Sequence, residues 1–185
     1  LLKSGALSHR LTIGYGKDIC SVIQFLHDYG KIYSDMKPDN VMIINNSDAS
    51  KTLGADRRIS TLKLIDFGAV IQTESGIPIQ YTPEYAAPEQ FLARHLDERT
   101  DIFNIGATLY HMITGRKPLP VNDENQNCRS FSERFIFDKK DKNINAHLKK
   151  IIRKCVENDP DKRYPSCREL YRALEKAEKQ THIKL

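Results

Sequence analysis

One short run of the sequence, Lys31 to Ile44, holds three polar side chains whose types and spacing could do chemistry. Asp35 is a carboxylate that can accept a proton, and Lys37, two residues later, can place a positive point charge beside it. Asn40 offers a neutral oxygen suited to a hard metal ion, and Pro38 stiffens the turn. A proton acceptor, a cation and an oxygen ligand are the groups that phosphoryl transfer requires.

The same run would also suit a polar turn between two strands, Ile32–Tyr33 and Val41–Ile44. Two motifs further along the chain favour the chemical interpretation, first Asp66-Phe67-Gly68 and then Ala87-Pro88-Glu89. In this order the motifs resemble the second half of a eukaryotic-type protein kinase domain. The resemblance implies a serine/threonine kinase that uses ATP and Mg²⁺ and takes protein Ser or Thr hydroxyls as substrate.

The resemblance also assigns roles to individual side chains. Asp35 would accept the hydroxyl proton, Lys37 would stabilise the transferring phosphate, and Met42 would offer an apolar floor to the adenine. The complete set that it implies is catalytic Asp35, Lys37 and Thr82, nucleotide-binding Lys37, Asn40, Met42 and Asp66, and Mg²⁺-binding Asn40 and Asp66.

Thr82 enters through the run Tyr81 to Glu89, which is similar to the G-T-P-E-Y-x-A-P-E run of serine/threonine kinases, with Tyr81 in place of glycine. By this resemblance Thr82 bonds near Asp35 and Lys37 and favours Ser/Thr over Tyr as the acceptor. A proline-rich turn before a helix is the alternative interpretation.

Apolar residues at helical spacing predict the elements that must position these side chains. Helices are expected over Lys17–Tyr29, Thr100–Thr114, Ile144–Val156 and from Ser166 onward, with a strand over Thr61–Ile65. The expected fold class is mainly α (α+β). It is a kinase-like C-terminal lobe spanning residues 1–185, with one small β-hairpin region at the catalytic loop.

The resemblance adds two contacts that would hold the site. Asp101, at the start of the apolar helix, would accept hydrogen bonds from the catalytic-loop backbone, although an acid in the first turn is also favoured by the helix dipole alone. Arg163, in a run similar to C-x-x-x-D-P-x-x-R, would pair with Glu89.

Composition limits the remaining possibilities. The chain has 185 residues, 39% of them hydrophobic, and a net charge of +5, which is typical of one globular domain with a core. The four cysteines form no C-x-x-C pair, so a reduced, cytoplasmic location is expected. The sequence indicates no nucleic-acid partner, no zinc site and no membrane-spanning segment.

No glycine-rich phosphate loop and no V-A-I-K lysine occur in the sequence. The resemblance therefore predicts that the N-terminal lobe is missing or is supplied by a longer parent, and that this portion alone is inactive. The alternative is a catalytically inert kinase-like binding module. A small-molecule phosphotransferase is disfavoured, because it calls for neither Lys37 nor Thr82.

Bacterial serine/threonine kinases give the best subfamily resemblance, through Tyr33 in place of the usual histidine and through Asp35-Met36-Lys37-Pro38. Ser34 stands where the family usually has an arginine that receives an activation-segment phosphate. Serine cannot make a bidentate bond to phosphate. We therefore expect that Thr73, Ser75 and Thr82 are not obligatory phosphorylation switches in the full-length parent.

Overall fold

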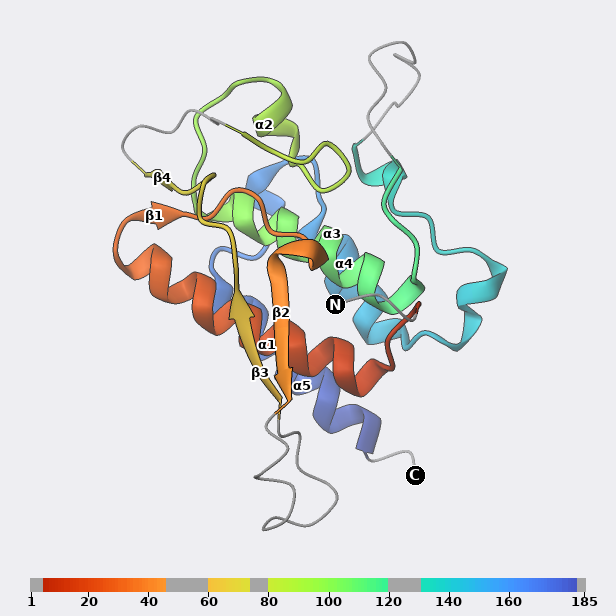
Figure 1. Ribbon diagram of the computed structural model, residues 1–185. Helices are drawn as coiled ribbons and strands as arrows, with labels where there is room; N and C mark the ends of the chain where they lie inside the picture. The colour runs from red at the N-terminus through yellow and green to blue at the C-terminus, as the bar shows by residue number, and fades with distance from the viewer. Residues whose placement is uncertain (1–4, 46–59, 74–79, 120–130, 183–185) are drawn as a thin grey trace.

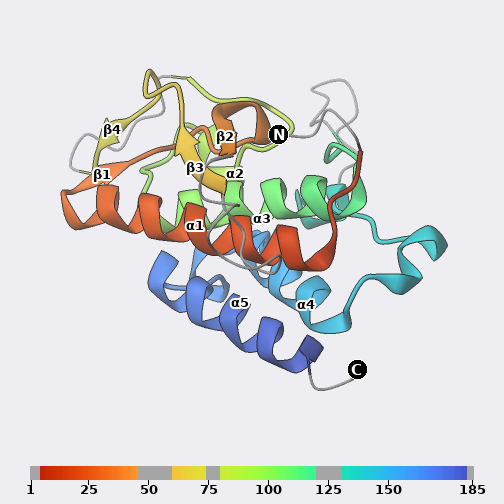
Figure 2. The ribbon, with the colours of Figure 1, turned by 60° about the horizontal axis from the view of Figure 1, so that its bottom comes forward.

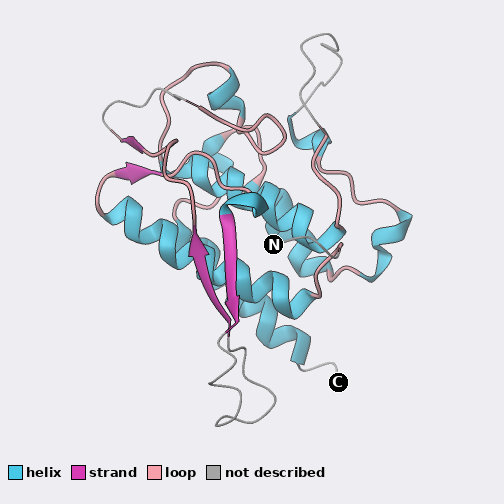
Figure 3. Cartoon of the chain, viewed as in Figure 1, coloured by secondary structure: helices cyan, strands magenta, loops and turns pink. Residues whose placement is uncertain are grey.

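The computed structural model describes residues 5–45, 60–73, 80–119 and 131–182. Helices make up most of the described chain, and its four strands are short (Figure 3). The elements in chain order are α1 (His9–Asp28), β1 (Lys31–Ile32), η1 (Pro38–Asn40), β2 (Val41–Asn45), β3 (Ser60–Leu64), β4 (Ile71–Gln72), α2 (Pro88–Phe91), α3 (Glu98–Thr114), η3 (Phe131–Arg134), η4 (Lys139–Asn143), α4 (Ala146–Cys155), η5 (Pro160–Lys162) and α5 (Cys167–His182).

The helices form layers, with α1 and α3 side by side and the strands above them in Figure 2. Helices α4 and α5 lie beneath, on the side away from β2 and β3. The core between these layers includes Ile19 and Ile23 of α1, Leu148 of α4 and Leu174 of α5. The site residues therefore lie along one side of a helical support.

Helix α3 is buried around nearly its whole circumference, as its apolar sequence predicts. At Gly106 a Cβ atom would lie 2.4 Å from the Cβ of Cys155 in α4, so only glycine allows this approach of the two helices. Gly115 ends α3 in the left-handed conformation, with φ 70°. The sequence prediction for this helix is confirmed to within two residues.

Helix α1 is longer than the sequence predicts. It begins at His9 rather than Lys17, after Ser8, whose Oγ accepts a hydrogen bond from the N–H of Leu11. Two glycines in its first half lower helix propensity and conceal this start. A Cβ at Gly16 would lie 2.9 Å from a side-chain methyl group of Leu109, so glycine leaves room there for Leu109 of α3.

The β-structure differs from the single hairpin region that the sequence predicts. The described residues form two separate two-stranded antiparallel sheets, β1 with β4 and β2 with β3. Strands β1 and β2 thus pair with different partners; in Figure 1, β2 and β3 cross in front of α1, whereas β1 and β4 lie above its left end. Strand β4 was missed because two residues are too short to show an alternating pattern.

The sequence also predicts a helix tail over Leu1–Gly5 and a polar loop between β2 and β3. Residues 1–4 and 46–59, which carry most of these two features, and Ser75 lie outside the described residues. In the part of the chain that the structure describes, no helix has the length and apolarity needed to cross a membrane.

Candidate active site

The catalytic loop runs between β1 and β2 and carries three of the predicted residues. Lys37 is extended, and Pro38 then starts the single turn η1, which ends at Asn40. The N–H of Asn40 bonds the carbonyl of Lys37 at 3.1 Å, which closes this turn. The loop therefore presents Asp35, Lys37 and Asn40 from a short and internally bonded segment.

The carboxylate of Asp35 is the centre of a compact hydrogen-bond network. Lys37 Nζ donates to Asp35 Oδ2 at 2.7 Å, and Thr82 Oγ1 donates to Asp35 Oδ1 at 2.6 Å. Lys37 Nζ also donates to Thr82 Oγ1 at 2.7 Å, so the three side chains form a closed triangle. Asn40 Nδ2 lies 2.9 Å from the Asp35 carbonyl and 3.2 Å from Oδ2. The predicted contact of Thr82 with both residues is confirmed.

Asp101 fixes the backbone just before Asp35. Its Oδ2 accepts from the N–H of Tyr33 at 2.9 Å, and its Oδ1 accepts from the N–H of Ser34 at 2.8 Å. Both peptide groups are buried, so their bonds to one carboxylate leave the loop little freedom. The predicted contact between Asp101 and the loop backbone is confirmed.

His27 lies behind Asp101 in the same buried cluster, with its Nε2 2.8 Å from Asp101 Oδ2. Burial alone would lower the pKa of His27, but the bond and negative charge of Asp101 outweigh burial and raise that pKa. Glu98 and Asp28 add weaker attraction in the same direction. The histidine is thus a packed, hydrogen-bonded residue.

Ser34 adopts the left-handed conformation, with φ 61°, next to the Asp35 carboxylate. Its hydroxyl donates to the carbonyl of Ala69 at 2.5 Å, and its carbonyl accepts from Gln90 Nε2 at 2.7 Å. All its polar groups are therefore bonded, since its N–H goes to Asp101. The small side chain ties the catalytic loop directly to the segment after Asp66.

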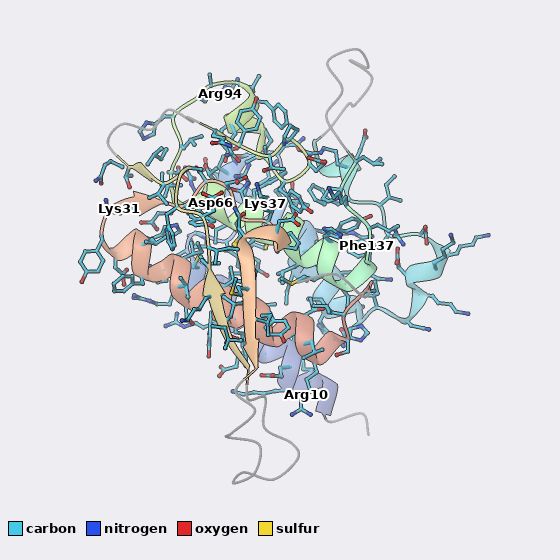
Figure 4. The ribbon with its side chains drawn as sticks, in the orientation of Figure 1. Arg10, Lys31, Lys37, Asp66, Arg94 and Phe137 are labelled. Carbon is cyan, nitrogen blue, oxygen red and sulfur yellow. The ribbon has the colours of Figure 1, made fainter. Side chains whose placement is uncertain are left out.

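Asp66 lies in the facing segment, exposed and with φ 72°. Its Oδ1 accepts from the N–H of Gly68 at 3.0 Å. The hydroxyl of Tyr33 bonds the backbone carbonyl of Asp66 at 2.8 Å, which links the two segments. Burial, with the charges of Asp35 and Asp66, raises the pKa of Tyr33 and keeps this donor protonated. Figure 4 labels Lys37 and Asp66, one from each segment.

The segment that carries Thr82 is held by an arginine that sequence reasoning missed. The buried guanidinium of Arg134 donates to the carbonyls of Pro83, Glu84 and Ala86 at 2.7, 2.6 and 3.0 Å. The sequence signal that could have found Arg134 is its charge, which stands directly before the apolar residues 135–137. Gln90, which bonds Ser34, was also missed, because a glutamine in a helix start has no distinctive pattern.

Glu89 and Arg163 form the predicted ion pair. Arg163 donates to Glu89 at 2.6 and 2.9 Å in a buried, forked geometry, and Thr100 Oγ1 donates to Glu89 Oε1 at 3.0 Å. The pair joins the end of the Thr82 segment to the helical layer. Such a fork fixes geometry more than it adds stability.

The two predicted metal ligands supply oxygen atoms that fit Mg²⁺ in type. The amide nitrogen of Asn40 is used by Asp35, so its oxygen is the atom that can face a cation. The Oδ2 atom of Asp66 is distinct from the oxygen that accepts from Gly68. Among the described residues no group of three or more His, Cys, Asp or Glu side chains could hold a metal. Mg²⁺ is usually bound by one or two protein oxygens, and phosphate and water oxygens fill its other coordination positions. The oxygens of Asn40 and Asp66 fit this pattern.

The structure therefore brings four of the six predicted residues into direct contact, namely Asp35, Lys37, Asn40 and Thr82. Asp66 comes from the facing segment, and Met42 follows in β2 with 48% of its side chain exposed. The catalytic and binding roles themselves stay predictions.

Known proteins share this sequence arrangement. Residues 1–173 match the protein kinase domain family. A probable serine/threonine-protein kinase of Clostridium perfringens (strain 13 / Type A) is 28% identical over 98% of this chain and 26% of its own length. The serine/threonine-protein kinase Pkn1 of Myxococcus xanthus is 30% identical over 86% of this chain and 23% of its own length.

The serine/threonine-protein kinase PknB of Mycolicibacterium smegmatis is 27% identical over 90% of this chain and 26% of its own length. The chain thus spans about a quarter of the length of these curated relatives. The match of the family over almost the whole chain agrees with the bonded Asp35 network and with the Glu89–Arg163 pair. The chain belongs to the protein kinase domain family, and bacterial serine/threonine kinases are among its relatives.

Proposed function

We propose that the chain is the catalytic-loop lobe of a protein serine/threonine kinase that transfers the γ-phosphate of ATP to protein Ser or Thr hydroxyls. The observation that carries the proposal is the closed network of Asp35, Lys37 and Thr82. An inert binding module has no physical need for a buried carboxylate bonded on both oxygens beside an ammonium group.

The network indicates which atom of Asp35 accepts the proton. Oδ2 already accepts from Lys37 and Asn40, whereas Oδ1 accepts from Thr82 and retains a second lone pair. A substrate hydroxyl would therefore approach Oδ1, next to the Thr82 side chain. Lys37 would balance the charge of the carboxylate and face the transferring phosphate.

Asn40 and Asp66 would hold Mg²⁺, and Met42 would contact the adenine of ATP. The bound Mg²⁺ would neutralise charge on the phosphates during transfer. The residues of the chain orient the acceptor hydroxyl and the phosphate, which is the main requirement of this reaction.

We also propose that this lobe needs a covering N-terminal lobe for full activity. Met42, Ile65 and Phe67 are apolar, lie close to the site in sequence, and are 48%, 40% and 52% exposed. A covering lobe would bury these side chains and exclude water from the nucleotide. The buried free thiols Cys20, Cys155 and Cys167 fit a reducing cytoplasmic location for the protein.

The test measures transfer of radiolabelled phosphate from ATP to a generic basic protein. It is carried out with this chain and with a longer protein that contains it. Asp35→Asn should lower transfer by about 10²–10⁴-fold without a large change in ATP affinity. Asp39→Asn is the matched control, because Asp39 is exposed in the same turn. In a longer protein that shows measurable transfer, equal rates for Asp35→Asn and the unchanged protein would contradict the proposed function.

A further inference from the structure

A groove between α4 and α5 lies on the side of the molecule away from the candidate active site (Figure 2). It consists of two adjoining hollows of about 620 and 390 Å³, which share His147 and Gln180 in their walls. The first hollow lies at the start of α4, and the second continues between α4 and α5. Neither hollow contains a residue of the kinase site.

The groove is strongly basic. Its lining includes five lysines, and no carboxylate contributes to either hollow in the described part of the chain. The net charge of the whole protein is only +5, so this groove concentrates positive charge. The lysines are Lys142, Lys149, Lys150, Lys154 and Lys176.

The lysines at the centre of the groove are not neutralised by acidic side chains in the described part of the chain. Among the described residues, Lys150, Lys154 and Lys176 have no carboxylate within ion-pair distance. Other lysines of the same layer do have one, since Lys179 lies 3.4 Å from Glu175 and Lys17 lies 2.5 Å from Glu178. Three ammonium groups close together repel one another, so an anionic partner would relieve an existing cost.

The floor of the groove is apolar between these charges. Ile151 lies in the wall with Ala173 and Ala177, and the ring of Tyr164 lies 4.5 Å from the Nζ of Lys154. An aliphatic floor flanked by lysines complements a segment in which acidic and aliphatic side chains alternate. The groove lining contains no arginine, so it lacks the bidentate fork that matches a phosphate group most closely. Its concave shape also differs from the flat face that a bilayer would contact.

We propose that the groove between α4 and α5 is a docking site for an acidic segment of a partner protein. Carboxylates of that segment pair with Lys150, Lys154 and Lys176, and its aliphatic side chains contact Ile151. A partner held there leaves the Asp35 site open. The proposal does not rest on the kinase assignment, because binding is measured directly.

The test is fluorescence anisotropy of a labelled octapeptide of alternating glutamate and leucine, titrated with the 185-residue chain. Lys150→Gln/Lys154→Gln/Lys176→Gln should weaken binding by about tenfold, since each exposed ion pair contributes modestly. The matched control is Lys63→Gln/Arg94→Gln/Lys139→Gln, which removes three exposed charges outside the groove. Figure 4 labels Arg94 at the top of the view, near the segment that Figure 1 labels α2. The control should change affinity by less than about twofold.

Three further results test whether the groove binds an acidic segment specifically. A peptide with glutamine in place of glutamate should bind at least about tenfold more weakly than the acidic peptide. Equal weakening by the groove and control variants would overturn the proposal, because it would show unspecific attraction of charge. Tighter, groove-dependent binding of a single-stranded oligonucleotide or of phosphatidylserine vesicles would also overturn it. Circular dichroism verifies that each variant is folded.

Discussion

Asp35 is positioned by residues from distant parts of the chain rather than by its own segment alone. Lys37 and Asn40 come from the same loop, Thr82 comes from the segment before α2, and Asp101 acts on the backbone from α3. The types and spacing of the first two were visible in the sequence. The contacts of Thr82 and Asp101 with this loop were predicted only from the resemblance to a family, because no local pattern links residues so far apart.

Thr82→Ala should lower the rate of phosphate transfer by about tenfold, the effect of ~1.4 kcal/mol on a barrier. The change removes the hydroxyl that joins Asp35 to Lys37, while the direct contact of these two residues persists. Thr82→Ser keeps the hydroxyl and should restore most of the activity. Measurement of kcat separately from ATP affinity checks the prediction. Equal rates for the alanine and serine variants would refute it.

Ser34 gives a prediction in which glycine is better tolerated than alanine. Both substitutions lose the buried bond to the Ala69 carbonyl, at about 1–2 kcal/mol of stability. Alanine also retains the strain of φ 61°, which glycine relieves by roughly 1 kcal/mol. Chemical denaturation should rank the free energy of unfolding as serine, then glycine, then alanine. Alanine more stable than glycine would contradict this account.

Helix α3 acts as the element that aligns the whole site. Asp101, Asn104 and Thr108 recur at helical spacing along it and each reaches outward to a loop. Asp101 bonds the backbone of Tyr33 and Ser34, Asn104 Nδ2 bonds the carbonyl of Tyr85 at 2.8 Å, and Thr108 Oγ1 bonds that of Met36 at 3.0 Å. One buried polar stripe thus orients both the catalytic loop and the Thr82 segment.

The His27–Asp101 contact between α1 and α3 predicts a pH dependence of stability. The pKa of His27 is raised in the fold above its ordinary 6.5, because the attraction of Asp101, Glu98 and Asp28 outweighs burial. The folded protein then binds the proton more tightly than the unfolded chain does. This stabilisation is complete below about pH 6.5 and is lost as the pH rises through the folded pKa.

The measurement is the free energy of unfolding against pH for the unchanged protein and for His27→Gln. The difference between the two should shrink as the pH rises above 6.5. Subtraction is necessary because burial lowers the pKa values of His9 and His111, whose contributions have the opposite sign. A difference that stays constant from pH 5 to 9 would show that His27 does not titrate with folding.

At the scale of elements, the sequence predicts long amphipathic helices well and short or polar features poorly. The apolar spacing of α4 and the capping serine at Ser166 were sufficient to locate the last two helices. Strand β4 is too short to show an alternating pattern, and the start of α1 is hidden by two glycines, which lower helix propensity. Arg134 was missed because its partners are backbone carbonyls, which no sequence pattern shows.

The whole molecule has two faces of different character. One carries the Asp35 network together with the exposed apolar side chains Met42, Ile65 and Phe67. The other carries the basic groove of α4 and α5. The helical core separates them, so the proposed docking of a partner on one face would leave the other face open for the proposed binding of nucleotide and substrate.

The exposed apolar face predicts that this chain by itself binds Mg-ATP weakly, with a Kd of about 1 mM or higher. Asn40 and Asp66 can hold the ion, and Met42 can contact one side of the adenine. A nucleotide on such an open surface keeps much of its hydration and lacks the orientation on which transfer depends. Each ~1.4 kcal/mol of lost positioning slows transfer about tenfold, so turnover by this chain should be slow or absent.

Titration calorimetry with Mg-ATP, paired with a radiolabelled transfer assay on a generic basic protein, measures both quantities. Met42→Ser should weaken the residual binding further, whereas Leu92→Ser, which removes an equally exposed apolar side chain from the end of α2, should leave it unchanged. Micromolar binding together with turnover that Asp35→Asn abolishes would show that these 185 residues suffice as a kinase. The exposure of Met42 and Phe67 would then reflect a site that works without a covering lobe.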